Sequence, residues 1–196
     1  MRYTEKEIQN LTSKYIEQGF SQGQVKEIKL GLKQGVDVSI YDNKEHDSFA
    51  MREIRLALKT GYYTPILSDT RFCGEQIAMM KLGLVEEVDI EKYADPKFDF
   101  EQMEQIREGL ENDENIEIWM KPEIDAKQMQ EIRWALEDGV DIEKYANPNK
   151  FSYSQMQEIR KGLKDNLDVS IYTKPELSWR NMRKIRNYLF KKSTLK

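Results

Sequence analysis

The apolar positions of this chain recur about every 26 residues. An isoleucine or methionine followed by a basic residue marks each copy of the pattern. These anchor residues are Ile28, Ile54, Met80, Ile106, Ile132, Ile159 and Ile185. The spacing is 26 residues, except for 27 between Ile132 and Ile159. Seven copies at one period are typical of a repeat architecture, in which each unit packs mainly on its neighbours.

Within each copy, the apolar residues predict one amphipathic helix. Numbered from the anchor as 0, apolar side chains stand at −3, 0 and +4, which share one helix face at about 100° per residue. Position −7 carries the candidate N-caps, which are Ser21, Asp47, Cys73, Asp99, Asp125, Ser152 and Ser178. Position +7 carries Gly35, Gly61, Gly139 or Asn166, which suit the left-handed residue that ends a helix.

A second, shorter element follows each predicted helix. Its sequences are VDVSIY, VDIEKY, NIEIW, VDIEKY and LDVSIY, with YYTPILSDT in the second copy. We expect caps from Asp37, Asp89, Asp141 and Asp168, and inward packing of Tyr41, Tyr93, Trp119, Tyr145 and Tyr172. The alternation in DVSIY also suits a strand. Because glutamate and lysine occur freely in so short a segment, we predict a short helical turn instead.

Two further columns flank the apolar stripe. Position +3 is small in six copies: Gly31, Ala57, Gly83, Gly109, Ala135 and Gly162. Glycine inside a helix costs about 1 kcal/mol relative to alanine, so we expect a neighbouring backbone to come close there. Position −4 is an amide in six copies: Gln24, Gln76, Gln102, Gln128, Gln155 and Asn181. We expect these amides to bond loop carbonyls of an adjacent copy, because buried polar groups need partners.

The elements together predict an all-α fold. The expected architecture is an α-solenoid of about seven helix-plus-short-helix repeats, forming one domain over residues 1–196. The repeats begin near residues 20, 46, 72, 98, 124, 151 and 177. Residues 1–19 are predicted to form a capping helix, since Thr4 and Glu7 fit a capping box. Tyr188 replaces the small residue at +3 in the last copy, which is typical of a terminal repeat.

Composition and net charge exclude several classes of function for this chain. The net charge is −4, so no global basic field attracts nucleic acid or a membrane. Cys73 is the only cysteine and His46 the only histidine, which excludes a disulfide framework and a thiolate metal cluster. The chain also lacks a His pair, a Gly-rich phosphate loop, a signal core and an apolar membrane span. We therefore expect a cytoplasmic protein that is not an enzyme and has no cofactor or metal.

Position +1 is basic in every copy. The column consists of Lys29, Arg55, Lys81, Arg107, Arg133, Arg160 and Arg186. A ladder of evenly spaced cations would suit a nucleic-acid phosphate backbone. In the structural alternative, each cation spans two repeats and binds carboxylates or helix-end carbonyls of the next repeat, with its stem along the apolar stripe. The acidic net charge favours the structural alternative, so nucleic-acid binding is the second functional hypothesis.

Position +2 is apolar in four copies. These residues, Leu30, Leu56, Leu82 and Trp134, are called the leucine strip below. The position lies about 200° from the anchor, on the face expected to meet water. An apolar strip on a surface usually marks a partner site, although this face would alternatively pack on the short helices. The favoured function is a scaffold or adaptor that binds a protein partner through the strip, and the strip would also suit a homodimer.

The repeat wording resembles a known group of sequences. Residues Met129 to Pro148 read MQEIRWALEDGVDIEKYANP. This wording is similar to tandem repeats of uncharacterised proteins from gut bacteria and their mobile elements. The resemblance covers nearly the whole chain from Phe20 onward and implies a helical repeat fold with an accessory role. It transfers no activity and no functional residue.

Overall fold

The computed structural model describes residues 3–141 and 147–194 of the protein. Over these residues the protein is all-helical and contains no β-strand. Backbone contacts divide the chain into two compact units, Met1–Glu111 and Asn112–Lys196. Within each unit, neighbouring helices pack against one another in sequence order.

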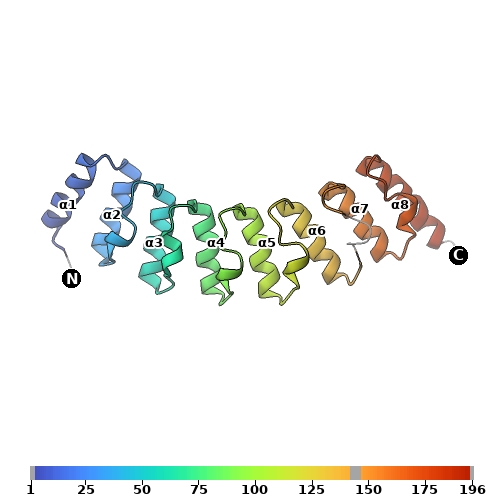
Figure 1. Ribbon diagram of the computed structural model, residues 1–196, viewed down its shortest axis with the longest axis horizontal. Helices are drawn as coiled ribbons and strands as arrows, with labels where there is room; N and C mark the ends of the chain where they lie inside the picture. The colour runs from blue at the N-terminus through green and yellow to red at the C-terminus, as the bar shows by residue number, and fades with distance from the viewer. Residues whose placement is uncertain (1–2, 142–146, 195–196) are drawn as a thin grey trace. The chain divides into compact units, whose positions relative to one another are not determined.

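The first unit has its α-helices side by side, with short 3-10 helices in the connections (Figure 1). Its α-helices are α1 (Glu5–Glu17), α2 (Gln22–Gln34), α3 (Ser48–Thr60), α4 (Gly74–Val85) and α5 (Phe100–Glu111). Its 3-10 helices are η1 (Val38–Ile40), η2 (Pro65–Ser68) and η3 (Ile90–Lys92). α1 begins with the predicted capping box, in which Thr4 and Glu7 bond each other's backbone or side chain.

The second unit repeats this order of elements. Its described helices are η4 (Ile116–Ile118), α6 (Ala126–Glu137), α7 (Tyr153–Lys164), η5 (Val169–Ile171) and α8 (Trp179–Thr194). α7 packs against α6 on one side and against α8 on the other. Tyr145, one of the aromatic residues predicted to pack inward, lies outside the described residues.

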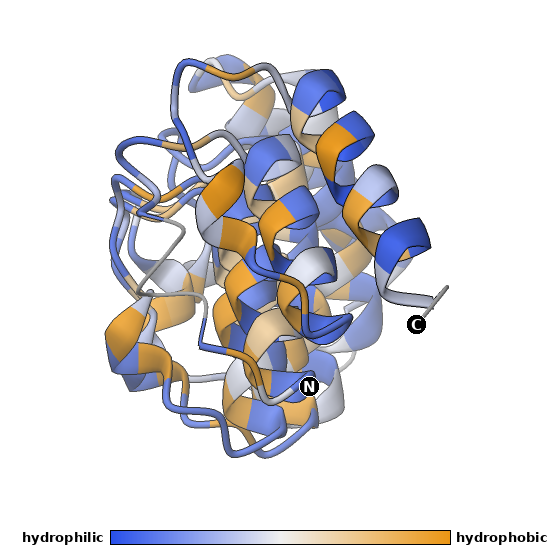
Figure 2. Ribbon diagram, turned by 90° about the vertical axis from the view of Figure 1, so that its right-hand side faces the viewer, coloured by the Kyte–Doolittle hydropathy of each residue, from blue (hydrophilic) through white to orange (hydrophobic). Residues whose placement is uncertain are grey.

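The apolar stripe that the pattern predicts is buried at most of its −3 and 0 positions, whereas at +4 Leu32 is buried and Leu136 is exposed. Figure 2 shows hydrophobic bands alternating with hydrophilic ones along the helices, while the loops are mainly hydrophilic. Five anchors are fully buried: Ile28, Ile54, Met80, Ile106 and Ile159. Full burial of an isoleucine or methionine side chain contributes about 1.5–3 kcal/mol, so the stripe is the main source of packing energy.

The helix ends are confirmed at most predicted positions. Asp47, for example, accepts a hydrogen bond from the Ala50 backbone N–H at 2.7 Å, as an N-cap does. Gly35, Gly61 and Gly139 end their helices with φ of 73°, 84° and 68°. Asn166 adopts the same left-handed conformation with φ of 55°. A side chain that bonds locally makes this conformation accessible to asparagine.

The short elements are 3-10 helices, which confirms the predicted helical turn over the alternative strand. Asp37, Asp89 and Asp168 each accept a hydrogen bond from the backbone N–H two residues ahead. The described aromatic residues of this element are all fully buried: Tyr41, Tyr93, Trp119 and Tyr172. In the divergent second copy, η2 places Leu67 in the same slot, also fully buried. A short helix therefore closes each of these segments with one large apolar side chain.

The small residues at +3 make room for this aromatic side chain, and not for a neighbouring backbone as the sequence suggested. A Cβ added at the glycine would fall far inside contact distance of the tyrosine hydroxyl oxygen of the same segment. The pairs are Gly31 and Tyr41 (1.9 Å), Gly83 and Tyr93 (2.1 Å), and Gly162 and Tyr172 (1.8 Å). The hydroxyl is held there because it donates to a backbone carbonyl of the long helix, as Tyr93 does to Met79 at 3.2 Å.

The amides at −4 bond loop carbonyls, one of which lies at the first residue of the next copy, as predicted. Gln24 Nε2 donates to the carbonyls of Lys44 (3.1 Å) and His46 (2.6 Å). Its Oε1 accepts from the Ser21 backbone N–H at the start of its own helix. Gln76, Gln128 and Gln155 make the equivalent pairs of bonds to the loops that follow their helices. We call this arrangement the glutamine clamp.

Candidate functional site

Six of the seven cations at +1 lie between neighbouring helices and pair with carboxylates there, whereas Lys29 is exposed. The ion pairs are Arg55 with Glu27 (2.8 Å), Lys81 with Glu53, Arg107 with Glu86, Arg133 with Glu114 (3.2 Å), Arg160 with Glu131 (2.9 Å), and Arg186 with Glu158 (2.9 Å). In each pair the carboxylate belongs to the preceding segment of the chain. The column therefore links successive segments within each unit. The structural alternative expected such links but placed the acceptors on the next repeat, whereas they lie on the preceding one.

Most of the acceptors occupy two positions of the preceding helix, −1 and +6. These positions lie about 20° apart around a helix, so both face the incoming cation. Arg160 uses both at once, with Glu131 at −1 (2.9 Å) and Asp138 at +6 (2.7 Å). On α4 the −1 residue is Met79, and there Arg107 binds Glu86 at +6. Where the carboxylate at −1 is absent, the carboxylate at +6 therefore binds the arginine.

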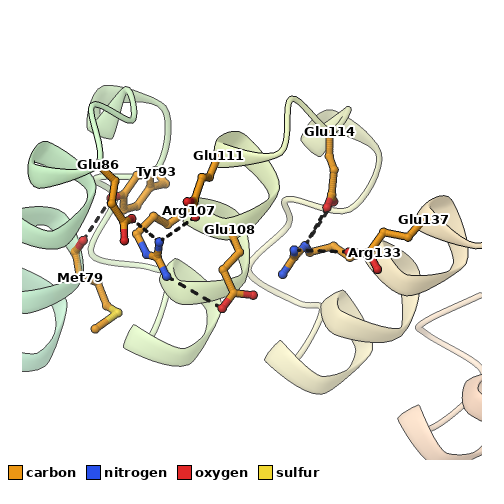
Figure 3. A network of polar contacts seen from close by, with 9 residues as sticks. All are labelled: Met79, Glu86, Tyr93, Arg107, Glu108, Glu111, Glu114, Arg133 and Glu137. Atoms are coloured by element: carbon orange, nitrogen blue, oxygen red, sulfur yellow. Dashed lines mark hydrogen bonds and ion pairs between the residues drawn. The ribbon is translucent and has the colours of Figure 1, made fainter.

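The two arginines shown in Figure 3 are each surrounded by carboxylates. In the first unit, Arg107 also approaches Glu111 (3.4 Å) and Glu108 (3.9 Å) on its own helix. In the second unit, Arg133 meets Glu114 and, at 3.9 Å, Glu137. The two arginine side chains are only 8% and 5% exposed. A guanidinium held in this position among protein carboxylates is little exposed and offers little to a phosphate.

The leucine strip is less exposed than the sequence predicted. Leu30, Leu56 and Leu82 lie on α2, α3 and α4, at one position of three consecutively packed helices. Each is half-buried. In the second unit Trp134 is also half-buried, with the guanidinium carbon of Arg160 5.2 Å from its ring centre. Each strip residue thus presents part of its apolar surface to solvent within its own unit.

The first unit also contains an apolar groove of about 430 Å³. Pro65 and Ile66 of η2 form one wall, and Leu84, Val88 and Ile90 around α4 and η3 form the other. Asp89 and Glu91, both exposed, stand at its rim. The groove arises at the divergent YYTPILSDT segment, whose Pro-Ile pair replaces the Ser-Ile or Glu-Lys pairs of other short elements. We call it the η2–η3 groove.

A second hollow, of about 640 Å³, lies beside His46. It is lined mainly by polar groups, among them Tyr15, whose hydroxyl donates to the Asp42 carboxylate at 2.7 Å. His46 itself is only 2% exposed, and its Nδ1 has no hydrogen-bond partner among the described residues. Burial lowers the pKa of His46, outweighing the opposite effect of Asp47, Glu45 and Asp69. Desolvation disfavours the charged imidazolium, so the ring is neutral in the folded protein at neutral pH.

This burial predicts a pH-dependent stability that a His46→Phe variant should lack. The pKa of His46 is lower in the folded than in the unfolded chain, so unfolding takes up a proton below about pH 6.5. The stabilisation is complete above the unfolded-state pKa and is lost as the pH falls. We expect the difference in free energy of unfolding, variant minus wild type, to increase as the pH falls from about 8 to about 5. Urea denaturation at each pH measures this, and a constant difference would contradict it.

The comparisons with known proteins add no relative. Protein-family models, curated proteins and solved structures give no match to this chain. The resemblance to repeats of gut bacteria therefore stays a prediction. Among the described helices, none combines the length and apolar character that crossing a bilayer requires.

Sequence reasoning identified the cations of the linking pairs but not their acceptors. The signal was present in the sequence, because position −1 is glutamate in four copies: Glu27, Glu53, Glu131 and Glu158. In each case the next copy has a basic residue at +1. The η2–η3 groove was not predicted either. It depends on how two short helices face each other, which spacing along one helix does not reveal.

Proposed function

We propose that this chain is an α-solenoid scaffold of about seven repeats that binds a protein partner and performs no catalysis. Three features support the solenoid. The 26-residue pattern runs through both units, neighbouring helices pack in sequence order, and contacts between segments recur at fixed pattern positions, as in the glutamine clamp. In such an array each repeat contacts mainly its neighbours and the surface is extended, which suits partner binding.

One observation carries the binding proposal. Leu30, Leu56 and Leu82 occupy one pattern position on three helices that pack in succession, and all three remain half-buried. Core positions of the same helices, such as Ile28 and Ile54, are fully buried. Aligned apolar side chains with exposed surface form a strip instead of scattered single residues, and such strips mark interaction sites. The partner would present a complementary apolar ridge to α2, α3 and α4.

Trp134 is proposed as a separate aromatic contact in the second unit. Tryptophan is enriched among the residues that dominate binding energy at protein interfaces. Arg160 lies against its ring, 5.2 Å from guanidinium carbon to centroid, which fixes the indole without covering it completely. Nucleic-acid binding through the basic column receives no such support, because six of its seven cations are bound to Glu27, Glu158 and the other carboxylates between helices.

Leu56→Glu combined with Leu82→Glu tests the proposal. We expect near-wild-type helicity and melting temperature, because the two side chains are only half-buried, and loss of the captured partner. The measurement is affinity capture from a native bacterial lysate on the immobilised protein, after nuclease treatment, with bound proteins identified and quantified.

A charge-matched control uses apolar residues outside the strip. Ile16 and Val85 are 62% and 44% exposed, so Ile16→Glu with Val85→Glu adds the same two carboxylates elsewhere in the first unit. This control should retain the partner. A strong drop in melting temperature of the strip variant would show that the leucines belong to the core. Equal capture by both variants would contradict the proposed site.

A further inference from the structure

The charges of this chain are segregated. The last 17 residues, from Arg180, contain seven lysines or arginines and no aspartate or glutamate. The whole chain contains 31 basic and 35 acidic residues, so everything before Arg180 is strongly acidic. The basic helix of one copy therefore attracts the acidic part of another copy, and such attraction raises association rates.

The outward face of α8 differs in sign from the same face of the other helices. On α6 and α7, positions −1 and +6 are acidic and bind the arginine of the next segment, as Glu131 and Asp138 do. On α8 the same two positions are Lys184 and Lys191, both exposed. Between them stands Tyr188, 65% exposed, where other helices have glycine or alanine. Residues 184, 188 and 191 share one face by their i, i+4, i+7 spacing.

This face disfavours another helix of the same pattern. An incoming arginine at +1 would meet two lysines in place of two carboxylates, and like charges at close range are repulsive. The bulky Tyr188 also occupies the site that a buried tyrosine hydroxyl fills beside Gly83 or Gly162. The face instead matches a surface with an apolar depression and carboxylates at its edge.

The η2–η3 groove is such a surface. Its walls are Pro65, Ile66, Leu84, Val88 and Ile90, and its volume of about 430 Å³ accommodates an aromatic side chain. The exposed carboxylates of Asp89 and Glu91 border it, with exposed Glu87 in the loop that leads into it. Asp89 uses one oxygen to cap η3, bonding the Glu91 N–H at 3.1 Å, and stays at the rim.

We propose that the protein self-associates head to tail, with α8 of one copy docked on the η2–η3 groove of a second copy. Tyr188 enters the groove, and Lys184 and Lys191 pair with the acidic residues at its rim. Tyrosine suits the central position because it buries a large apolar ring while keeping its hydroxyl available to a polar partner. The two surfaces are different parts of the chain, so the interface is heterologous and can add copy after copy.

Two charge-reversed variants test this interface. The first carries Lys184→Glu and Lys191→Glu on α8. The second carries Glu87→Lys and Glu91→Lys beside the groove and leaves the capping Asp89 intact. Sedimentation velocity over a range of concentrations should show self-association of the wild type at low salt. It should weaken by more than about tenfold in either variant and in about 1 M salt, where charges are screened beyond about 3 Å.

Mixing the two variants gives the sharpest result. The basic α8 of the second variant matches the acidic groove of the first, and the acidic α8 of the first matches the lysine-bearing groove of the second. We expect the mixture to regain self-association, although neither variant associates alone. Tyr188→Ala should weaken self-association as well, since it removes the side chain that fills the groove.

Matched controls place the same changes elsewhere. Asp113→Lys with Glu117→Lys alters the same two pattern positions before and within η4, and Lys121→Glu with Lys174→Glu alters two exposed lysines. Both controls should associate like the wild type. A wild type that stays monomeric at low salt, or a mixture that stays monomeric, would overturn the proposal. So would association that disappears with nuclease, which would assign α8 to nucleic acid instead.

Discussion

Replacing Glu158 by alanine is expected to lower the free energy of unfolding by about 3–5 kcal/mol. The Glu158 side chain is 0% exposed and accepts hydrogen bonds from Arg183 Nε (2.8 Å) and Arg186 Nε (2.9 Å) of the next helix. Removing it leaves Arg186, whose side chain is 16% exposed, with Asp165 at 3.5 Å as its remaining carboxylate. The uncompensated charge, more than the lost pair, accounts for the large effect. Urea denaturation and amide hydrogen exchange of α7 and α8 measure it.

Glu137→Ala is the matched control for Glu158→Ala. Glu137 also faces an arginine, Arg133, but at 3.9 Å and with its own side chain 51% exposed. An exposed pair of this kind contributes about 0–1 kcal/mol, so the control should change little. Glu158→Gln should fall between the two, because an amide oxygen still accepts hydrogen bonds but carries no charge. Similar losses for Glu137→Ala and Glu158→Ala would show that burial of the pair is not what matters.

Gly83→Ala is expected to lower the free energy of unfolding by about 1–3 kcal/mol, although alanine is the better helix former by about 1 kcal/mol. The added Cβ would lie 2.1 Å from the Tyr93 hydroxyl oxygen, which is fixed by its hydrogen bond to the Met79 carbonyl. Tyr93 is fully buried, so neither side can move without displacing the short helix η3. Thermal and urea denaturation measure the loss.

Tyr93→Phe should rescue the Gly83→Ala variant. Without the hydroxyl, the nearest atoms to the new Cβ are Ile90 Cγ2 at 3.0 Å and Tyr93 Cζ at 3.3 Å, contacts that a small shift relieves. Tyr93→Phe alone should cost about 1 kcal/mol for the lost hydrogen bond. The double variant should therefore be more stable than the sum of the two changes predicts, with a coupling of about 0.5–3 kcal/mol. Simple additivity would contradict the clash as the cause.

The elements of the fold could be predicted from the sequence because their signals are local. Capping residues such as Asp47, left-handed glycines such as Gly61, and the apolar stripe through Ile54 each act within one helix. The short elements were correctly predicted as helical because Glu and Lys occur within them. Even the glutamine clamp was predictable, because Gln24 lies near the buried stripe and an amide there requires a partner.

Features that depend on two segments at once were predicted poorly. The small column at +3 was assigned to an approaching backbone, whereas Gly31 accommodates the hydroxyl of Tyr41. The sequence does not reveal this pairing clearly, since three copies combine glycine with tyrosine but the fifth combines Ala135 with Tyr145. The strip residue Leu56 was expected to face water and is half-buried, because helical angle alone does not show how neighbouring loops cover a position.

The glutamine clamp has a consequence for how the number of repeats in such a chain can change. Its donor is a side chain of one segment, but its acceptors are backbone carbonyls, as at Lys44 in the loop that follows and at His46, where the next segment begins. Carbonyls are present whatever the residue, so a duplicated or deleted segment of one period finds its clamp again without any matching substitution. The linking ion pairs, such as Glu27 with Arg55, require two particular side chains. The number of segments can therefore change without loss of the clamp. The ion pairs between segments need matching substitutions afterwards, and these pairs determine which segments can pack side by side.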